Sequence, residues 1–410
     1  MLEGIASKVT RDIAGEPAES GDPADFSIVL GGPLFQLLRR AHVSGGALEL
    51  VRRRMVVIAA VAWLPLLVLA LVGGRAFGNG VAVPFLKDIE VHARFLVALP
   101  LLIAAELVVH VRMRTVASEF VVRGLVTPET VERFRHAVRA AIRLRNSVVA
   151  EIAMVAIVYA LGIPVLWREL AALDVPTWYA DASPGGTGLT AAGAWFVYVS
   201  VPLFQFLLLR WYFRLIVWLR FLWQVSRIPL HVSAMHADRM AGFGFLAATA
   251  FAFVPLAMAH GALLAGVVAN RIFYAGTALT DSKMEVAVVV AFLLLLVFGP
   301  LTVFARQASM AKRAALRVYG RLAQRYVSDF ERTWLPGGLP AEASPLGSGD
   351  IQSLADLSNS LETVRSTRLV PITRQAVMTL VVATLVPLVP LLLTVIPAEE
   401  LARRLLKLVM

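Results

Sequence analysis

Seven long apolar stretches constrain the fold of this chain more than any other feature of its sequence. Each holds about 20 consecutive, mostly apolar residues, which is the length that an α-helix needs to cross a bilayer. Across the chain 58% of residues are hydrophobic and 16% are charged, against about 45–50% and about 25% in a soluble domain. The sequence therefore predicts an all-α integral membrane protein and excludes a plain soluble enzyme, a disordered protein and a fibrous repeat. The predicted spans are Met55–Val72, Ala93–Val111, Ser147–Trp167, Ala191–Leu209, Phe243–Ala269, Glu285–Ala305 and Ala376–Ile396.

Basic residues are concentrated in alternate connections between these stretches. Lys and Arg are frequent before the first span and between spans two and three, four and five, and six and seven, whereas the other three connections hold few. If all seven spans cross, the basic segments lie on one side, which the positive-inside rule assigns to the cytoplasm. The sequence thus predicts a cytoplasmic N-terminus and an external C-terminus, although the basic tail Pro397–Met410 departs slightly from the pattern.

The net charge of +11, from 39 Lys+Arg against 28 Asp+Glu, indicates which partners to expect. Anionic lipid headgroups attract each basic side chain near the membrane by about 1 kcal/mol. Because the basic segments border the predicted spans, we expect them to contact anionic headgroups on the cytoplasmic face of the bilayer, and we expect no nucleic acid partner. Cysteine is absent, which excludes disulfides, thiolate metal sites and a cysteine nucleophile.

The segments outside the spans divide the chain into five parts. The first is rich in Gly, Pro, Ala and acidic residues, which is typical of disorder. The second has apolar residues before a pair of arginines and is too short to span, which is typical of an interfacial amphipathic helix. The predicted parts are a disordered segment at 1–25, the interfacial helix at 26–54, a six-span bundle with cytoplasmic helical extensions at 55–305, a cytoplasmic helical segment at 306–375 with a flexible linker at 336–349, and a seventh span with its tail at 376–410.

Amphipathic helices are predicted on the cytoplasmic side. Val131, Phe134, Val138 and Ile142 recur at steps of three and four after a Thr-Pro start, which indicates a helix that runs straight into the third span. The fourth span is expected to continue inward through arginines mixed with aromatic residues, a composition that suits the headgroup layer. These arginines are Arg210, Arg214 and Arg220.

Four ionisable residues lie within predicted spans, and such groups often mark transport or proton pathways. Glu106 and His110 are four residues apart and share a helix face, and Glu151 lies near the same end of the next span. These three side chains are candidates for a cytoplasm-facing site for a proton or a cation. The alternative is that Glu106 and Glu151 pair with arginines and hold helices together. His260 lies in the fifth span beside a glycine, and it either lines a pore or makes an interhelical hydrogen bond.

A second polar cluster precedes the fifth span and contains His231, His236, Asp238 and Arg239. Its spacing matches no strong metal-binding pattern. The simpler interpretation is that Asp238 caps the following helix, that Arg239 anchors the helix at the interface, and that nearby glycines allow close packing. The sequence also has no P-loop, H-E-x-x-H, G-x-S-x-G or EF-hand pattern, so no metal and no cofactor are predicted.

A third cluster follows the predicted linker and contains Asp350, Gln352 and Asp356. The apolar residues after Asp350 recur on one side of a predicted helix, and Asp350 is suited to its N-cap. Asp350 and Asp356 are six residues apart and do not share a helix face, which argues against a paired-carboxylate site. This helix is either a segment that docks on the arginine-rich helices or an ordinary capped helix with a solvated face.

Three stretches of the sequence carry a resemblance to a known family. They are Arg143–Ser147 together with Glu151, His236–Gly244, and Gly349–Leu357. Together they resemble an uncharacterised family of polytopic inner-membrane proteins of Gram-negative bacteria, and the resemblance covers most of the chain from Phe26 onward. It implies a bacterial inner (plasma) membrane and a multi-pass fold, and it implies no activity, ligand or catalytic residue.

Three functions are compatible with these patterns. The first is a channel or transporter for a small solute or ion, motivated by the charged groups within the spans. The second is a membrane scaffold or interaction subunit that docks partners on its basic cytoplasmic helices. The third is a lipid-acting membrane enzyme that uses His231, His236 and Asp238, and a homo-oligomer is compatible with the first. Prolines within the spans, which predict kinks, are typical of transporters but also of irregular bundles; they are Pro65, Pro100, Pro164, Pro202, Pro255, Pro300, Pro387 and Pro390.

Overall fold

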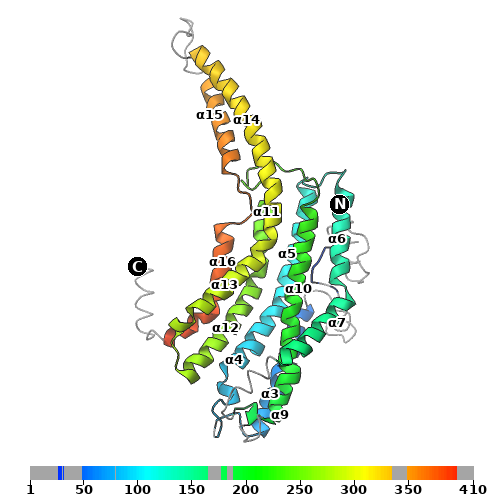
Figure 1. Cartoon of the computed structure of the whole chain (residues 1–410), viewed down its shortest axis with the longest axis vertical. Coiled ribbons are helices and arrows are strands. Elements are labelled where there is room, and N and C mark those ends of the chain that lie inside the picture. The colour runs from blue at the N-terminus through cyan, green and yellow to red at the C-terminus, as the bar shows by residue number, and fades with distance from the viewer. Residues whose placement is uncertain are drawn as a thin grey trace.

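A computed structural model describes residues 26–29, 31, 49–78, 80–164, 177–181, 188–334 and 349–394. The predicted disordered segment 1–25, the linker at 336–348, most of the interfacial helix, the ends of the third and seventh spans and the tail lie outside these residues. Within them the chain is a bundle of long helices from which one pair of helices projects (Figure 1).

Six helices in the described part are long and apolar enough to cross a membrane, and a bent pair raises the number to seven if it counts as one span. The described residues therefore confirm a helical chain with six or seven helices that are long and apolar enough to span, and seven membrane crossings stay a prediction. The six helices are Val51–Val72, Ile89–Val122, Ala191–Val225, Gly244–Ala275, Leu279–Trp334 and Arg374–Thr394.

The bent pair corresponds to the predicted third span and the amphipathic helix before it. Helix α6 (Val131–Arg145) and helix α7 (Val148–Ile157), which continues as a π-helical turn to Gly162, meet at an angle of 43°. The expectation of a straight continuation is wrong, because α6 ends at Asn146 and Ser147 starts a new helix. The Ser147 side chain accepts a hydrogen bond from the Ala150 amide at 3.2 Å, which is an N-cap.

The other helices of the described part are named as in Figure 1, and only one very short strand pair accompanies them. Strands β1 (Ala180–Asp181) and β2 (Gly188–Leu189) are antiparallel. The helices are α3 (Glu49–Val72), α4 (Ile89–His92), α5 (Leu99–Val122), α9 (Ala191–Trp195), α10 (Val201–Val225), α11 (Gly244–Ala247), α12 (Val254–Ala275), α13 (Lys283–Phe298), α14 (Ala305–Trp334), α15 (Gly349–Ser366) and α16 (Arg374–Leu385).

Prolines within the spans coincide with departures from α-helical geometry. A proline has no amide hydrogen, so the helix around it loses a bond and widens or tightens locally. Pro100, Pro164 and Pro202 each follow a π-helical segment, and Pro255 follows a 3₁₀ segment. Pro300, Pro387 and Pro390 lie within 3₁₀ segments. Only Pro65, among these eight, lies inside an uninterrupted α-helix. The predicted irregularities are thus present at seven of the eight prolines.

The aromatic core on the α6 side forms where α6, α10 and the N-terminal segment meet. The stripe on α6 is buried, including Phe134 and Val138, as the sequence predicted. Phe26 is also fully buried, and its ring centroid lies 4.4 Å from that of Phe221 on α10. The described residues 26–29 are not helical, so this part of the predicted interfacial helix is a buried irregular segment that packs inside the bundle.

Helices α14 and α15 run side by side and project beyond the rest of the molecule (Figure 1). Helix α14 is the continuation of the sixth span, because a 3₁₀ turn, α13, a second 3₁₀ segment and α14 form one unbroken helical run of 56 residues, Leu279–Trp334. We call the α14–α15 pair the arm. The helical structure predicted for the segment 306–375 is therefore present on both sides of the linker, as α14 and α15, and these two helices pack against each other.

Candidate functional site

A cluster of buried charges joins three helices of the bundle. Glu106 on α5 accepts hydrogen bonds from Arg54 on α3 and from Arg214 on α10, the latter at 2.7 Å. A third arginine, Arg210 on α10, lies 4.0 Å from the same carboxylate. All four side chains are buried, so Arg210 and Arg214 face the interior of the bundle, whereas the sequence pattern favoured contact with lipid headgroups. The reason is that the carboxylate one helix away compensates their charge inside the bundle.

Glu151 extends this cluster to a fourth helix. Its carboxylate lies 3.7 Å from Arg210, so this arginine stands between the two glutamates. We call Arg54, Glu106, Glu151, Arg210 and Arg214 the arginine cluster. The structure thus brings Glu106 and Glu151 together in the way the second sequence interpretation described, with arginines between them. Whether they also form a transport site stays a hypothesis.

The N-terminal segment lies against the arginine cluster, and no sequence pattern predicted this contact. The Ser27 carbonyl accepts a hydrogen bond from Arg145 at 2.6 Å, and the Gly31 carbonyl accepts one from Arg210 at 3.1 Å. His110 is hydrogen-bonded to the Ser27 hydroxyl at 2.9 Å. Gly31 has a φ of +142°, and a Cβ there would lie 2.5 Å from the Asn146 side-chain oxygen. Only glycine fits this position, because both the backbone angle and the space exclude a side chain.

The arginine cluster carries more positive than negative charge among the described residues. It has three arginines and two glutamates, and the buried Nε of Arg54 has no hydrogen-bond partner in the described part of the chain. A buried surplus of positive charge repels cations and attracts anions. The cluster is therefore suited to holding helices together and, if it binds an ion at all, to binding an anion.

His260 on α12 is hydrogen-bonded through both ring nitrogens. Its Nδ1 lies 2.8 Å from the Leu256 carbonyl, which can only accept, so Nδ1 carries the proton. Its Nε2 then accepts a hydrogen bond from the Tyr212 hydroxyl on α10 at 2.9 Å. The neighbouring Gly261 packs against α16, where an added Cβ would lie 2.1 Å from the Thr384 carbonyl oxygen. This geometry corresponds to the interhelical hydrogen bond that the sequence left open beside a pore role.

The polar cluster before the fifth span forms a tight turn. Asp238 accepts hydrogen bonds from the backbone amides of Met240 at 2.8 Å and of Gly244, the first residue of α11, at 2.8 Å. The N-cap residue of α11 is Phe243, so Asp238 contacts the start of this helix from the preceding turn and is not its N-cap residue. His236 Nδ1 lies 3.1 Å from the Asp238 carboxylate, and the His231 amide donates to the Leu125 carbonyl at 2.8 Å. No group of three or more His, Cys, Asp or Glu residues in the described part of the chain is arranged to hold a metal ion.

The turn also holds the base of the arm. The Arg239 carbonyl accepts a hydrogen bond from the Arg368 amide at 2.8 Å, and the Ala234 carbonyl accepts one from the Thr367 hydroxyl at 2.9 Å. From α14, Lys312 donates to the carbonyls of Arg365 at 2.6 Å and Thr367 at 2.9 Å. The arm is therefore attached to the bundle at its base by specific hydrogen bonds.

The third sequence cluster lies on the arm. Asp350, near the start of α15, accepts a hydrogen bond from the Trp334 indole at 3.1 Å, and its carbonyl accepts one from the Tyr326 hydroxyl at 3.1 Å. Gln352 donates to Asp356 at 2.9 Å along the exposed side of α15. This segment thus contacts the arginine-rich α14 within the same chain.

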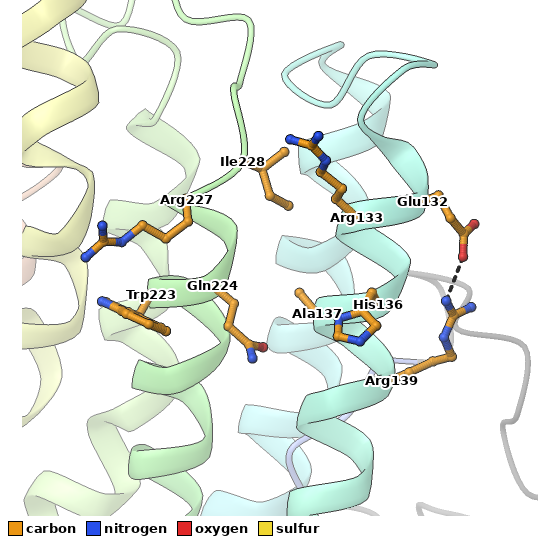
Figure 2. Close-up of a pocket in the computed structure, with 9 residues that line it drawn as sticks. All are labelled: Glu132, Arg133, His136, Ala137, Arg139, Trp223, Gln224, Arg227 and Ile228. Carbon is orange, nitrogen blue, oxygen red and sulfur yellow. Dashed lines mark hydrogen bonds and ion pairs between the residues drawn. The ribbon is translucent and has the colours of Figure 1, made fainter.

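An open groove lies between α6 and the end of α10, and sequence reasoning did not single it out. It has a volume of about 590 Å³ (Figure 2). No sequence signal could have located it, because its walls come from two helices that meet only in the folded chain. Its lining residues are Glu132, Arg133, His136, Ala137, Arg139, Trp223, Gln224, Arg227 and Ile228.

Comparisons with known proteins found no matching family model, no matching curated protein and no matching solved structure. The resemblance to a family of inner-membrane proteins therefore stays an expectation, and the function has to be inferred from the geometry of this chain.

Proposed function

We propose that this chain is a multi-pass protein of a bacterial inner membrane that serves as an interaction subunit, with the arm as its docking surface. The apolar helices support the membrane location, and the basic connections support a cytoplasmic N-terminus and an external C-terminus. In this orientation the arm, which continues the sixth span, projects into the cytoplasm.

The observation that carries the proposal is the exposure of the arm. In the 30-residue α14 only Ala308 is buried, and in the 18-residue α15 only Val364 is buried. Apolar side chains nevertheless point outward: Val318 is 55% exposed, Leu322 is 50% exposed and Ile351 is 50% exposed. Apolar residues grouped on exposed helices away from lipid are typical of a protein interface.

The distance of the outer part of the arm from the bilayer argues against lipid headgroups as its binding partner. A helix rises about 1.5 Å per residue, so α14 reaches about 45 Å from its first residue. Charge interactions in the cell are screened beyond about 8 Å. The distal arginines of α14, such as Arg321 and Arg325, are therefore too far from the bilayer to serve as headgroup contacts.

The charge of α14 indicates the chemistry of the partner. Helix α14 contains seven basic residues and two acidic residues, so its surface is strongly positive. The acidic residues of α15 compensate only part of this charge. An acidic protein surface with an apolar patch complements the exposed face of α14, because charge steers the encounter and apolar contacts hold the complex.

Site-specific photo-crosslinking in native membranes tests this proposal. A photo-reactive residue at Leu322 should give one main adduct with an acidic protein, whereas the same residue at Val288, an exposed site on α13, should not. The double variant R317Q/R321Q should lose the adduct. The matched variant R143Q/R220Q, which removes two exposed arginines outside the arm, should keep it. Adducts that are alike at both positions, or that are unchanged in R317Q/R321Q, would contradict the proposal, and an adduct of two identical chains would replace the acidic partner with a second copy.

Transport of a small ion is a second candidate, favoured by the arginine cluster within the spanning helices. Because the described cluster has a surplus of positive charge, we expect an anion rather than the proton or cation that the sequence suggested. Purified protein in liposomes should then conduct a small anion, and the flux should change in E151Q, which removes a negative charge from the cluster, but not in E285Q, where a glutamate outside the cluster is changed. Equal flux in both variants would remove the cluster from any transport role.

The third function, a lipid-acting enzyme, receives no comparable support from the geometry. Asp238 is engaged by backbone amides, and the described His and Asp residues of the turn form no three-ligand group. We therefore do not propose it.

A further inference from the structure

The groove between α6 and α10 contains polar groups that have no partner among the described residues. Arg133 and His136 on α6 are exposed and make no hydrogen bond or ion pair within the described part of the chain. Gln224 extends from α10 toward α6 (Figure 2), and its side-chain oxygen is buried without a hydrogen-bond partner among the described residues. A cavity that contains unpaired donors and an unpaired amide is suited to a polar ligand.

The charge in the groove selects an anion. Its one acidic residue, Glu132, is already held by Arg139 at 2.6 Å, and Figure 2 shows this pair on the side of α6 that faces away from α10. Arg227 lies at the rim, in the turn that follows α10. Figure 2 shows its side chain extending away from α6, and its guanidinium is 5.1 Å from the centroid of the Trp223 ring. Arginine side chains hold phosphate oxygens by paired, charge-assisted hydrogen bonds. Arg133 in the groove and Arg227 at its rim are therefore suited to a phosphate group.

We propose that the groove binds the headgroup of an anionic phospholipid, with the phosphodiester at Arg133 and His136, a headgroup hydroxyl at Gln224, and Arg227 as a more distant positive charge at the rim. This inference rests on the proposed membrane orientation and is independent of the arm and its partner. It assigns a specific site to the general attraction between the basic inner face and anionic lipid.

A strip of exposed residues on α10 favours a lipid over free phosphate. Ile216, Leu219 and Trp223 are spaced by three and four residues, so they lie on one face of the helix, and all three are exposed. A tryptophan followed by an arginine one turn later is typical of the membrane interface, where the ring lies at the level of the headgroups. Acyl chains along Ile216 and Leu219 place their headgroup beside Trp223, at the mouth of the groove. Free phosphate has no acyl chains and would not contact this strip.

Native mass spectrometry of the full-length protein in detergent tests the proposal. The probes are phosphatidylglycerol, whose headgroup is anionic and hydroxylated, and phosphatidylcholine, whose headgroup is zwitterionic. The wild-type protein should retain phosphatidylglycerol in preference to phosphatidylcholine. Because a basic side chain near a lipid headgroup contributes about 1 kcal/mol, each of R133Q and R227Q should weaken this retention about fivefold. The matched variant R313Q, which changes an exposed arginine of α14, should retain the lipid as the wild type does.

Three outcomes would overturn the proposal. The first is equal retention of both lipids by the wild type. The second is an equal loss in R133Q and R313Q, which would show a diffuse charge effect and not a site. The third is complete displacement of the lipid by inorganic phosphate, which would make free phosphate the ligand. Each readout is a bound mass measured on the isolated chain, so a failure here leaves the crosslinking test of the arm unaffected.

Discussion

The interior of the bundle and the arm use the same residue types in opposite ways. In the bundle, arginines and glutamates lie inside: α10 buries 13 of its 25 residues, and Arg210 and Arg214 are among them. In the arm, arginines lie on the surface, and α14 buries one residue of 30. A buried arginine paired with a carboxylate holds helices together, whereas an exposed one is accessible to a partner. Paired substitutions, one in each region, therefore compare how much the free energy of unfolding depends on similar residues in the bundle and in the arm.

The largest difference in stability between the bundle and the arm is expected when a glutamate is replaced in each. Glu106→Leu leaves three arginines in the bundle without their main counter-charge, and breaking a buried ion pair in this way costs about 3–5 kcal/mol. Glu362→Leu changes an exposed residue of α15 and should alter stability by less than about 0.5 kcal/mol. Unfolding of the detergent-solubilised protein by heat or denaturant measures both. Similar stabilities of the two variants would mean that the arginine cluster does not lock the bundle.

Replacing a helical glycine by alanine should lower the stability in the bundle and raise it in the arm. In Gly261→Ala the new Cβ would lie 2.1 Å from the Thr384 carbonyl oxygen, so α12 and α16 must separate, at a cost of about 1–3 kcal/mol. In Gly320→Ala, on α14, the Cβ meets nothing within 4 Å, and the better helix propensity of alanine should stabilise the helix by about 0.5–1 kcal/mol. The same unfolding measurement compares them. A stabilised Gly261→Ala variant would show that the two helices approach less closely than described.

Local patterns in the sequence predicted much of this fold. The apolar stretches predicted the spanning helices, the stripe through Phe134 and Val138 predicted the buried face of α6, and the prolines predicted most of the irregular helix geometry. These features depend on residues that are close together in the chain. The sequence also associated Asp238 with the start of the following helix, and its carboxylate does accept a hydrogen bond from the Gly244 amide six residues later, but the N-cap residue is Phe243.

The contacts that join distant segments could not be predicted in the same way. Glu106 is separated by 52 residues from Arg54 and by 108 residues from Arg214, and no local pattern relates them. The interleaving of arginines with aromatic residues on α10 instead suggested the headgroup layer, because a single sequence does not show a carboxylate on a neighbouring helix. The bend between α6 and α7 and the burial of residues 26–29 were missed for a similar reason, since both depend on packing against the rest of the bundle.

A smaller difference is expected for two tyrosines that donate hydrogen bonds. Tyr212→Phe leaves Nε2 of the buried His260 without its donor, and an unsatisfied buried acceptor costs about 1–3 kcal/mol. Tyr326→Phe, on the arm, removes a bond to the Asp350 carbonyl, which is exposed and can bind water instead, so the cost should stay below about 0.5 kcal/mol. An equal loss in both variants would indicate that the arm is covered in the assembled protein, and the arm would then have to be regarded as part of a larger core.

The smallest effect on stability, and the most informative for function, is expected for Leu322→Ser on the arm. Leu322 is 50% exposed and α14 has almost no buried surface, so the isolated protein should lose less than about 0.5 kcal/mol. If the apolar patch of the arm anchors a partner, the same change removes a contact from the centre of that interface and should weaken the complex by about 1–2 kcal/mol, which is roughly a tenfold loss of affinity. Unfolding of the purified chain and crosslinking from the neighbouring exposed position Val318 separate the two effects. A stable variant that crosslinks as well as the wild type would mean that the exposed apolar residues of the arm are not a docking surface, and that the difference between arm and bundle is one of solvation alone.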